Sequence, residues 1–306
     1  MSDGPVEPPA TGGRSALAAH RSGDRAWWET AITDVSNGRI VTRGRPIEDL
    51  IGTTSFVQHL VLLFSGRMIP PPAAALLEAV MVAGADHGPR APSIAAARMA
   101  ATCGVTFNSS VATGINLLGD IHGGAAGNAM RALLAVEALA SSAAADGPDG
   151  GPDDGPTGES EPGGGGPGPG PDAAALAYVR EARDRQEAVA GFGHQLHDLD
   201  PRRAPLLALC EAAAADGTID GRYVEVAKAV ERALDEVVGR PVTINIDGLW
   251  AIVCCELDLP PDFAMGAFCL SRGAGIVAHA YEEASTGVKI KGPCPPGDDL
   301  VRYIGE

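Results

Sequence analysis

The sequence predicts a mostly α-helical protein, and three observations support this prediction. Hydrophobic residues make up 45% of the chain and aromatic residues only 4%, so alanine and leucine, two strong helix formers, supply most of the apolar surface. Apolar side chains recur with helical spacing along most of the chain, and Gly or Pro separates one such stretch from the next. Strand-like patterning is confined to one short stretch. The length of 306 residues is enough to bury one large core or two modest ones.

The individual elements follow in order from these patterns. A β-hairpin is expected near residues 31–45, where Asn37-Gly38 forms a favoured turn dipeptide. The segments that show helical spacing, each punctuated by Gly or Pro, are 55–69, 71–85, 92–104, 109–120, 127–145, 173–191, 222–239, 247–258 and 262–285.

Two stretches lack the apolar residues that a core needs. Residues 1–14 are rich in Pro and Gly and are expected to form a disordered arm. Residues 146–172 contain 11 Gly, 7 Pro and 7 acidic residues besides one Thr and one Ser, so no burial can offset the entropy of ordering them. We interpret this second stretch as a disordered surface insertion, with a domain boundary as the alternative.

Composition and motifs also exclude several classes of function. The net charge of −16 argues against a nucleic-acid partner, because such binding depends on Lys and Arg meeting phosphates. No apolar run approaches the about 20 residues that span a bilayer, and the N-terminus lacks a secretory signal, so no membrane association is expected. Six cysteines without a CxxC pair fit a reducing, cytoplasmic location. With no metal-spaced His/Cys cluster, P-loop or Rossmann fingerprint, we expect no metal ion.

The stretch GFGHQLHDLDPR, residues 191–202, contains the first candidate site residue, His194. Gly191 and Gly193 carry no side-chain bulk, so a ligand can approach both the imidazole ring and the backbone there. The alternative is an ordinary Gly-rich turn with a surface histidine.

Two further candidates lie at predicted helix starts. His122 precedes Gly123 and Gly124, which open onto a long helix; the helix dipole there favours a neutral imidazole that can donate a hydrogen bond to a developing negative charge. The alternative is a capping or turn histidine. Asp247 lies between an apolar extended segment and an apolar helix, where it is either an N-cap or a carboxyl group in a dry cleft with a raised pKa.

Taken together, these motifs resemble the citrate synthase superfamily. The matching pieces are RGRPIEDLIG (43–52), DHGPRAPSIAAARMA (86–100), GDIHGGAAGNA (119–129), GFGHQLHDLDPR (191–202), NIDG (245–248), SRGAGIVAHAYEE (271–283) and RYIGE (302–306). The resemblance implies a mostly α, citrate synthase-like fold with a large domain (15–145 and 240–306) and a smaller helical domain (173–239). It also implies a homodimer whose subunits share residues across an isologous interface.

The resemblance further implies a role for each candidate. His122 would stabilise the enolate of the acetyl-CoA thioester, Asp247 would exchange a proton with its methyl carbon, and His194 would hydrogen-bond the oxaloacetate carbonyl. The residues expected to bind the carboxylates of the four-carbon acid are His87, Arg202, Arg272 and Lys291. The glycines expected along the coenzyme A thioester are Gly123, Gly124, Gly191 and Gly193. Coenzyme A enters as part of the substrate, and no permanently bound cofactor is expected.

Three departures from the family pattern bear on this assignment. Gln195 stands where an arginine commonly follows the GFGH histidine. The arginine of Asp-Pro-Arg lies one residue closer than usual, so Arg203 is an alternative to Arg202. Lys291, in KIKGPCPP, stands near the place where family members carry an Arg-Pro that reaches the partner's site, and a lysine lacks the planar fork of arginine.

The short form of the chain resembles citryl-CoA lyases, which cleave citryl-CoA to acetyl-CoA and oxaloacetate in a retro-Claisen reaction. One alternative is a citrate synthase or 2-methylcitrate synthase, which condenses the same kind of fragments and then hydrolyses the thioester. A second alternative is a non-catalytic paralogue that binds coenzyme A.

Overall fold

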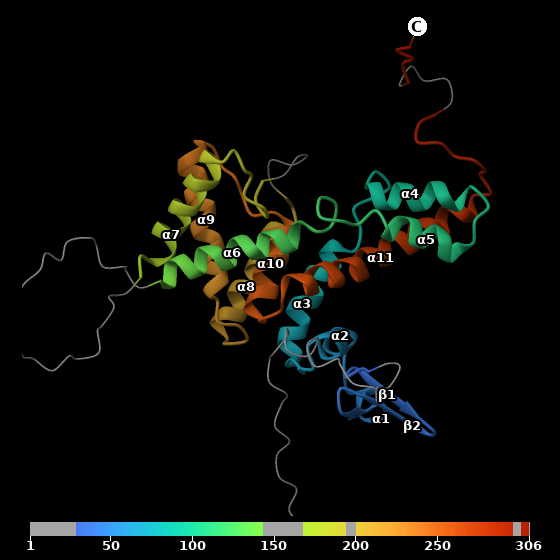
Figure 1. The fold of residues 1–306 in the computed structure, drawn as a ribbon, viewed down its shortest axis with the longest axis horizontal. Coiled ribbons are helices and arrows are strands. Elements are labelled where there is room, and N and C mark those ends of the chain that lie inside the picture. Colours follow the sequence, from blue (N-terminus) through green and yellow to red (C-terminus); the bar gives the residue numbers. More distant parts are fainter. Residues whose placement is uncertain (1–28, 143–167, 194–199, 296–300, 306) are drawn as a thin grey trace, which may run out of the picture. The chain divides into compact units, whose positions relative to one another are not determined.

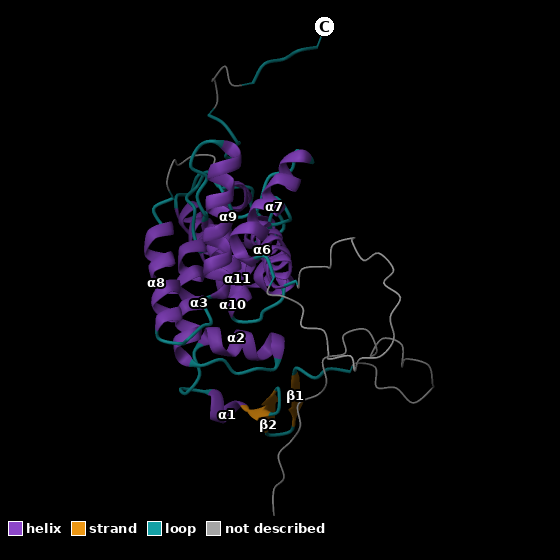
Figure 2. Cartoon of the chain, turned by 90° about the vertical axis from the view of Figure 1, so that its left-hand side faces the viewer, coloured by secondary structure: helices purple, strands orange, loops and turns teal. Residues whose placement is uncertain are grey.

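The computed structural model describes residues 29–142, 168–193, 200–295 and 301–305. The predicted arm (1–14), most of the predicted insertion and His194 lie outside these described residues. The chain divides into two compact units, Met1–Thr53 and Thr54–Glu306, and each is described by itself. Helices dominate both the sequence of elements and the views of the chain (Figures 1 and 2), which confirms the predicted fold class.

The first unit contains a small antiparallel sheet. Its elements are β1 (Thr33–Ser36), β2 (Arg39–Thr42), β3 (Arg45–Pro46) and the one-turn helix α1 (Ile47–Leu50). The strands pair in the order β1-β2-β3, with Ser36 opposite Arg39 across the Asn37-Gly38 turn. The predicted hairpin is therefore confirmed, including its turn.

The second unit is built from helices alone among the residues described. They are α2 (Phe56–Ser65), α3 (Pro71–Gly84), α4 (Pro92–Ala101), α5 (Phe107–Ile115), α6 (Ala125–Ser141), α7 (Gly170–Asp184), α8 (Arg203–Ala215), α9 (Arg222–Val238), α10 (Ile246–Glu256) and α11 (Pro261–Ser285). Local chemistry sets many of the ends. Ser55 and Gln58 form a capping box at the start of α2, and Gly66 ends that helix in the left-handed conformation.

All predicted helices are found, and two described helices were not predicted: the one-turn α1 and α8. Helix α8 follows directly on the Asp-Pro-Arg turn, with Pro205 in its first turn, where a missing N–H costs no hydrogen bond. Helix α7 ends at Asp184, earlier than the predicted residue 191, and begins at Gly170, inside the predicted insertion. The segment after α7 is thereby free to fold back toward the N-terminus of α10.

Helix α10 lies at the centre of the core. Its residues from Gly248 to Cys255 are all buried, and α3, α6, α8, α9 and α11 pack around it. Helices α7 and α9, which belong to the predicted small domain, pack against each other and on α6 within the same apolar core. The division into a large and a small domain stays a prediction.

Helix α11 runs from the core beside α6 to a second, smaller apolar cluster beside α4 and α5 (Figure 1). Contrary to the expectation from apolar runs, it is long and apolar enough to span a membrane by length and composition, the one such helix among those described. However, half of its most apolar window is buried within the protein, and it carries the buried charged side chains of Arg272 and Glu283. These features are typical of a core helix.

Candidate active site

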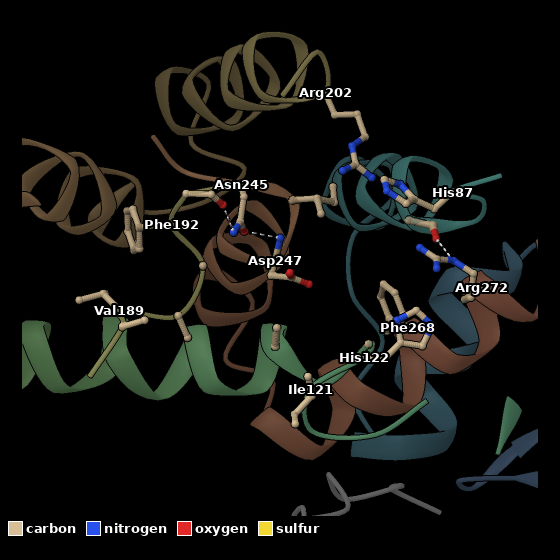
Figure 3. A pocket seen from close by; sticks show the side chains of 18 residues that line it. His87, Ile121, His122, Val189, Phe192, Arg202, Asn245, Asp247, Phe268 and Arg272 are labelled. Carbon is tan, nitrogen blue, oxygen red and sulfur yellow. Dashed lines mark hydrogen bonds between the residues drawn. The ribbon is translucent and has the colours of Figure 1, made fainter. Parts of the chain in front are cut away.

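Several helix ends of the second unit meet around a cavity of about 630 Å³. The C-terminus of α3, the segment before α6, the segment after α7, the N-terminus of α10 and one side of α11 all contribute to it (Figure 3). Its lining residues are Gly84, His87, Ile121, His122, Gly123, Ala125, Ala188, Val189, Ala190, Gly191, Phe192, Gly193, Arg202, Asn245, Ile246, Asp247, Phe268 and Arg272. Arg202, His87 and Arg272 gather on one side, Val189 and Phe192 lie on the other, and Asp247 lies between them.

Two arginines on the cationic side are anchored to the C-terminus of α3. A helix leaves its last carbonyl groups without intrahelical partners and carries partial negative charge there. Arg202 Nη1 donates to the Ala83 carbonyl at 3.2 Å, and Arg272 Nε donates to the Gly84 carbonyl at 2.9 Å. The fold therefore fixes both guanidinium groups beside the cavity, where they can bind a negatively charged ligand.

Asp200 orients Arg202 further. Its carboxylate, 1% exposed, accepts hydrogen bonds from Arg202 Nε at 2.9 Å and from Nη2 at 2.7 Å, the two-pronged geometry that arginine favours. Arg203, the alternative weighed from the sequence, instead places Nη2 2.7 Å from both carboxylate oxygens of Glu231 on α9. Arg202, and not Arg203, therefore lines the cavity.

Arg272 is buried, with 5% of its surface exposed, and its guanidinium carbon lies 5.0 Å from the centre of the Phe268 ring. The ring face attracts the cation and holds the guanidinium plane. Burial lowers the pKa of Arg272, partly opposed by the negative charge of Asp86, but a guanidinium remains protonated in proteins. The side chain is thus a fixed positive charge.

His122 lies between the N-termini of two helices. It precedes the Gly124 N-cap of α6, and its Nε2 accepts the backbone N–H of Ser93, in the first turn of α4, at 3.3 Å. An amide N–H can donate only to an unprotonated nitrogen, so we assign the proton of the neutral ring to Nδ1. Burial lowers the pKa of His122, and the positive charges of Arg272 and His87 lower it further. A neutral, donating imidazole is what the sequence position predicts.

Asp247 is the second residue of α10, and it is not the N-cap. That position belongs to Asn245, whose side-chain oxygen accepts the backbone N–H groups of Asp247 at 2.9 Å and Gly248 at 3.1 Å. The carboxyl group of Asp247 is therefore not needed to cap α10. Burial raises the pKa of Asp247, although the charges of Arg202 and Arg272 oppose this. A carboxyl group with a raised pKa is suited to take and return a proton.

The glycines after α7 are needed for packing as well as for access. Gly191 has a φ of +89°, and a side chain there would come within 2.7 Å of Ala129 Cβ and 2.9 Å of Gly248 Cα. The backbone of this segment pairs with the one before α10, with Gly193 N donating to the Thr243 carbonyl at 2.8 Å. Close backbone packing, which the sequence interpretation did not include, thus brings α6, α10 and the segment after α7 together at the cavity.

The glycines after His122 serve a similar purpose. A side chain at Gly123 would come within 2.8 Å of the Phe268 ring on α11. One at Gly124 would come within 2.7 Å of the Gly119 carbonyl and of Met265. Gly123 lines the cavity, whereas Gly124 is not among its lining residues.

Of the other predicted site residues, only some lie at this cavity. His87 lines it and is exposed. His194 lies outside the described residues; it follows Gly193 in the sequence, and Gly193 lines the cavity. Lys291 is not a lining residue; its Nζ lies 2.8 Å from Glu283 Oε1 instead. Its expected role toward a partner subunit stays a prediction.

Four residues that sequence reasoning missed also shape the site: Asn245, Ser93, Asp200 and Phe268. Asn245 had a readable signal, because an Asn between an extended segment and an apolar helix is a typical N-cap. Ser93 reaches His122 from 29 residues away, and Asp200 and Phe268 orient arginines that lie two and four residues from them, contacts that only the fold reveals.

The arrangement combines three chemical capacities in one cavity. It offers a carboxyl group with a raised pKa, a neutral imidazole that donates from Nδ1, and two fixed guanidinium groups. Such a site can bind a dicarboxylate on its cationic side and move a proton at a weakly acidic carbon beside it. Within the described ranges, no three or more His, Cys, Asp or Glu side chains gather as metal ligands would.

Comparisons with known proteins identify relatives of this chain. Residues 66–293 match the family model described as citrate synthase, C-terminal domain. A citrate synthase from Haloferax volcanii is 27% identical over 233 residues, which cover 76% of this chain and 51% of that protein. The chain thus spans about half the length of this curated relative, and a putative citrate synthase 2 from Mycobacterium tuberculosis is likewise covered over 53% of its length.

Solved structures extend the comparison. Citryl-CoA lyase from Hydrogenobacter thermophilus superposes with a TM-score of 0.74 and 26% identity, covering 92% of this chain and 96% of that chain. ATP citrate lyase from Methanothrix soehngenii, in complex with citrate and coenzyme A, shares the fold at a TM-score of 0.71 and 19% identity, with 46% of that chain covered. The family model covers well over half of the chain, and this protein therefore belongs to the citrate synthase family.

Proposed function

We propose that this protein is a citryl-CoA lyase-type enzyme, which cleaves citryl-CoA to acetyl-CoA and oxaloacetate by a retro-Claisen reaction. The observation that supports this most strongly is the cavity that combines Asp247, of raised pKa, with the neutral imidazole of His122 and the anchored guanidinium groups of Arg202 and Arg272. The choice of lyase is supported by the likeness to a citryl-CoA lyase over 96% of that chain, whereas the curated citrate synthase is matched over 51%.

In the proposed reaction, the hydroxyl group of the citryl moiety loses its proton to His194. The oxygen electron pair then forms the carbonyl of oxaloacetate, and the carbon–carbon bond breaks toward the thioester. The resulting enolate oxygen accepts a hydrogen bond from His122 Nδ1, and Asp247, in its protonated form, gives its proton to the enolate carbon. The methyl group of an acetyl thioester is a very weak carbon acid, and a lone carboxyl group cannot exchange a proton with it efficiently. His122 and Asp247 must therefore act on the same acetyl unit.

The cationic side of the cavity would hold the carboxylates of the four-carbon product. Arg202 and Arg272 each keep N–H groups beyond those bound to α3, and His87 lies beside them (Figure 3). The apolar side, with Val189 and Phe192, would take the pantetheine arm of the thioester. The proposed roles of Gly123, Gly191 and Gly193 are to let the thioester approach the backbone along this wall.

A citrate synthase activity is the second candidate, because the curated relatives carry that name. The carbon–carbon step is the same in both reactions, so the same residues serve either direction. The difference lies in the thioester, which a synthase hydrolyses and a lyase leaves intact.

One experiment separates these activities. The protein is incubated with citryl-CoA, and separately with acetyl-CoA and oxaloacetate, while oxaloacetate and free coenzyme A thiol are measured. A lyase forms oxaloacetate from citryl-CoA and releases no thiol. Steady thiol release contradicts the lyase assignment and supports a synthase. Binding of coenzyme A without turnover of any of these substrates contradicts both and supports a non-catalytic paralogue.

The proposal includes a cytoplasmic homodimer. Apolar side chains on α5 and α11 are exposed in the single chain, among them Phe107 (46%), Leu270 (50%) and Tyr281 (68%), and a second copy would cover them. Light scattering should give twice the chain mass of 31.1 kDa. A monomer that stays active on dilution contradicts this part of the proposal.

A further inference from the structure

Helix α11 runs alongside the end of α3 and the segment that follows it, and contacts this stretch at successive positions. Ser271 Oγ donates to the Met81 carbonyl, and one residue later Arg272 Nε donates to the Gly84 carbonyl at 2.9 Å. Both carbonyl groups belong to the last turn of α3, so α11 fixes the point at which the chain leaves that helix.

The next turn of α11 contacts the segment itself. A side chain at Gly275 would collide with the Ala85 carbonyl and come within 3.1 Å of Asp86 Oδ1, so only glycine allows this approach. One turn further, His279 Nε2 lies 3.2 Å from Asp86 Oδ1. Positions 272, 275 and 279 share one face of the helix because they are three and four residues apart. This face holds the backbone up to the residue before His87.

The hydrogen-bond directions in this contact are fixed by Arg98 on α4. Its Nη1 lies 3.0 Å from His279 Nδ1, and because a guanidinium can only donate, Nδ1 is the acceptor. The ring proton is therefore on Nε2, which donates to Asp86 Oδ1. The same oxygen accepts the backbone N–H of Gly88 at 3.2 Å. The Asp86 carboxylate thus ties α11 to the residue that follows His87.

We propose that Asp86 and His279 are positioning residues, which hold the segment that carries His87 in register with Arg272 so that His87 meets a substrate carboxylate. For the role of His87 this rests on the proposed function. The two residues do not touch the substrate; they act through the backbone on either side of His87.

Two features distinguish this pair from an ordinary stabilising contact. The Asp86 side chain is 52% exposed, and exposed ion pairs of this kind contribute little to the free energy of unfolding. Burial works to raise the pKa of Asp86, but the hydrogen bonds from Gly88 and His279 outweigh it and hold the pKa below its ordinary value. The hydrogen bonds from Gly88 and His279 therefore stabilise the ionised form of Asp86.

The chemistry of the pair gives matched variants. Gln in place of His279 can donate to Asp86 through Nε2 and offer its oxygen to Arg98, whereas Leu can do neither. Asn in place of Asp86 keeps an acceptor oxygen for both donors, whereas Ala does not. Glu282→Gln serves as the control, because Glu282 binds Arg98 and lies 3.8 Å from His279 Nδ1 on the same helix, but the structure as described gives it no hydrogen bond to residues 84–88.

The expected kinetic effect is specific for one substrate. In the condensation direction, His279→Leu and Asp86→Ala should raise KM for oxaloacetate about ten-fold with a smaller change in kcat, because His87 contributes binding rather than chemistry. KM for acetyl-CoA should stay within about two-fold. His279→Gln, Asp86→Asn and Glu282→Gln should behave like the unaltered protein.

Hydrogen exchange of a peptide covering residues 84–90 provides a readout that needs no activity. Faster exchange there in His279→Leu and Asp86→Ala, and not in the three other variants, supports the proposal. Equal effects of His279→Gln and His279→Leu, a rise in both KM values, or unchanged exchange overturn it. If the unaltered protein shows no turnover, the proposed function fails, and the exchange experiment alone decides whether the pair positions this segment.

Discussion

Asp247 places a carboxyl group where ionisation opposes folding. Its pKa is raised from the ordinary value of 3.8, mainly by burial, so the folded protein binds its proton more tightly than the unfolded chain. The contribution of this group to stability is fully present below the unfolded pKa and is lost as the pH rises through the folded pKa. Above the folded pKa, the ionised carboxylate therefore makes the fold less stable than the protonated form does.

The first prediction follows from this sign. Asp247→Asn should lower kcat of the proposed reaction roughly 10²- to 10⁴-fold, because the proposed proton donor is lost. The same change should raise Tm at pH 7 by about 2 °C, on the order of 1 kcal/mol for a chain of this size. The gain in Tm should shrink as the pH falls toward 4. A lower Tm for the variant at pH 7 would show that the carboxylate stabilises the fold.

The sequence signals the candidate reacting residues more clearly than the residues that hold them in place. His122 and Asp247 stand next to glycines at the ends of apolar segments, and the structure brings both to one cavity. The choice between Arg202 and Arg203 depended on their carboxylate partners, which are Asp200 two residues before Arg202 and Glu231 on α9 for Arg203. Adjacent, identical residues cannot be distinguished from a single sequence, because only the fold decides which of them meets which carboxylate.

At the scale of elements, Gly and Pro were reliable markers of helix ends. The nine segments with helical spacing all contain a helix, because Gly ends helices and Pro begins them at low cost. Helix α8 was missed although residues 206–215 are rich in Ala and Leu, since it follows at once on the Asp-Pro-Arg turn and carries Pro205. The start of α9 was predicted correctly at residue 222, but its capping group could not be predicted, because it comes from another helix.

That capping group is Glu256 at the end of α10. Helix α9 begins after Gly221, which has no side chain to cap it, and Glu256 accepts the backbone N–H groups of Gly221 at 2.9 Å, Tyr223 at 2.7 Å and Val224 at 3.2 Å. Glu256→Ala should lower the free energy of unfolding by about 1–3 kcal/mol, since charged hydrogen bonds to buried donors are lost. Urea unfolding measures the change. Glu236→Ala, at an exposed ion pair on α9, is the control and should change it by less than about 1 kcal/mol.

The contact between the segment after α7 and α10 gives a third prediction. Gly191 and Gly239 both have positive φ, but a side chain at Gly239 would meet nothing within 4 Å, whereas one at Gly191 would crowd Ala129 and Gly248. Gly239→Ala should cost about 1 kcal/mol for its backbone conformation alone. Gly191→Ala should cost a further 1–3 kcal/mol, roughly, and reduce activity by displacing the cavity wall. Equal unfolding midpoints for the two variants would contradict the packing explanation.

For the whole molecule, the flanks of the predicted insertion allow a direct test. Gly168 lies so close to the end of α6 that a side chain there would collide with the Ala140 and Ser142 carbonyl groups. The ends to be joined are therefore neighbours. Replacing residues 143–167 by a short Gly-Ser linker should leave Tm and the rate of citryl-CoA cleavage nearly unchanged. Loss of folding in this variant would show that the replaced residues are part of the structure.

The anchoring of Arg202 and Arg272 on the last carbonyl groups of α3 has a consequence for how the protein can change. Each guanidinium group binds the C-terminal end of α3 and is also placed to bind a ligand in the cavity. A substitution of either arginine that changes the ligand preference therefore also removes its hydrogen bond to the end of α3. Changes that adapt the cavity to other carboxylic-acid ligands, in evolution or by engineering, should therefore occur first at neighbouring wall residues and not at these two arginines.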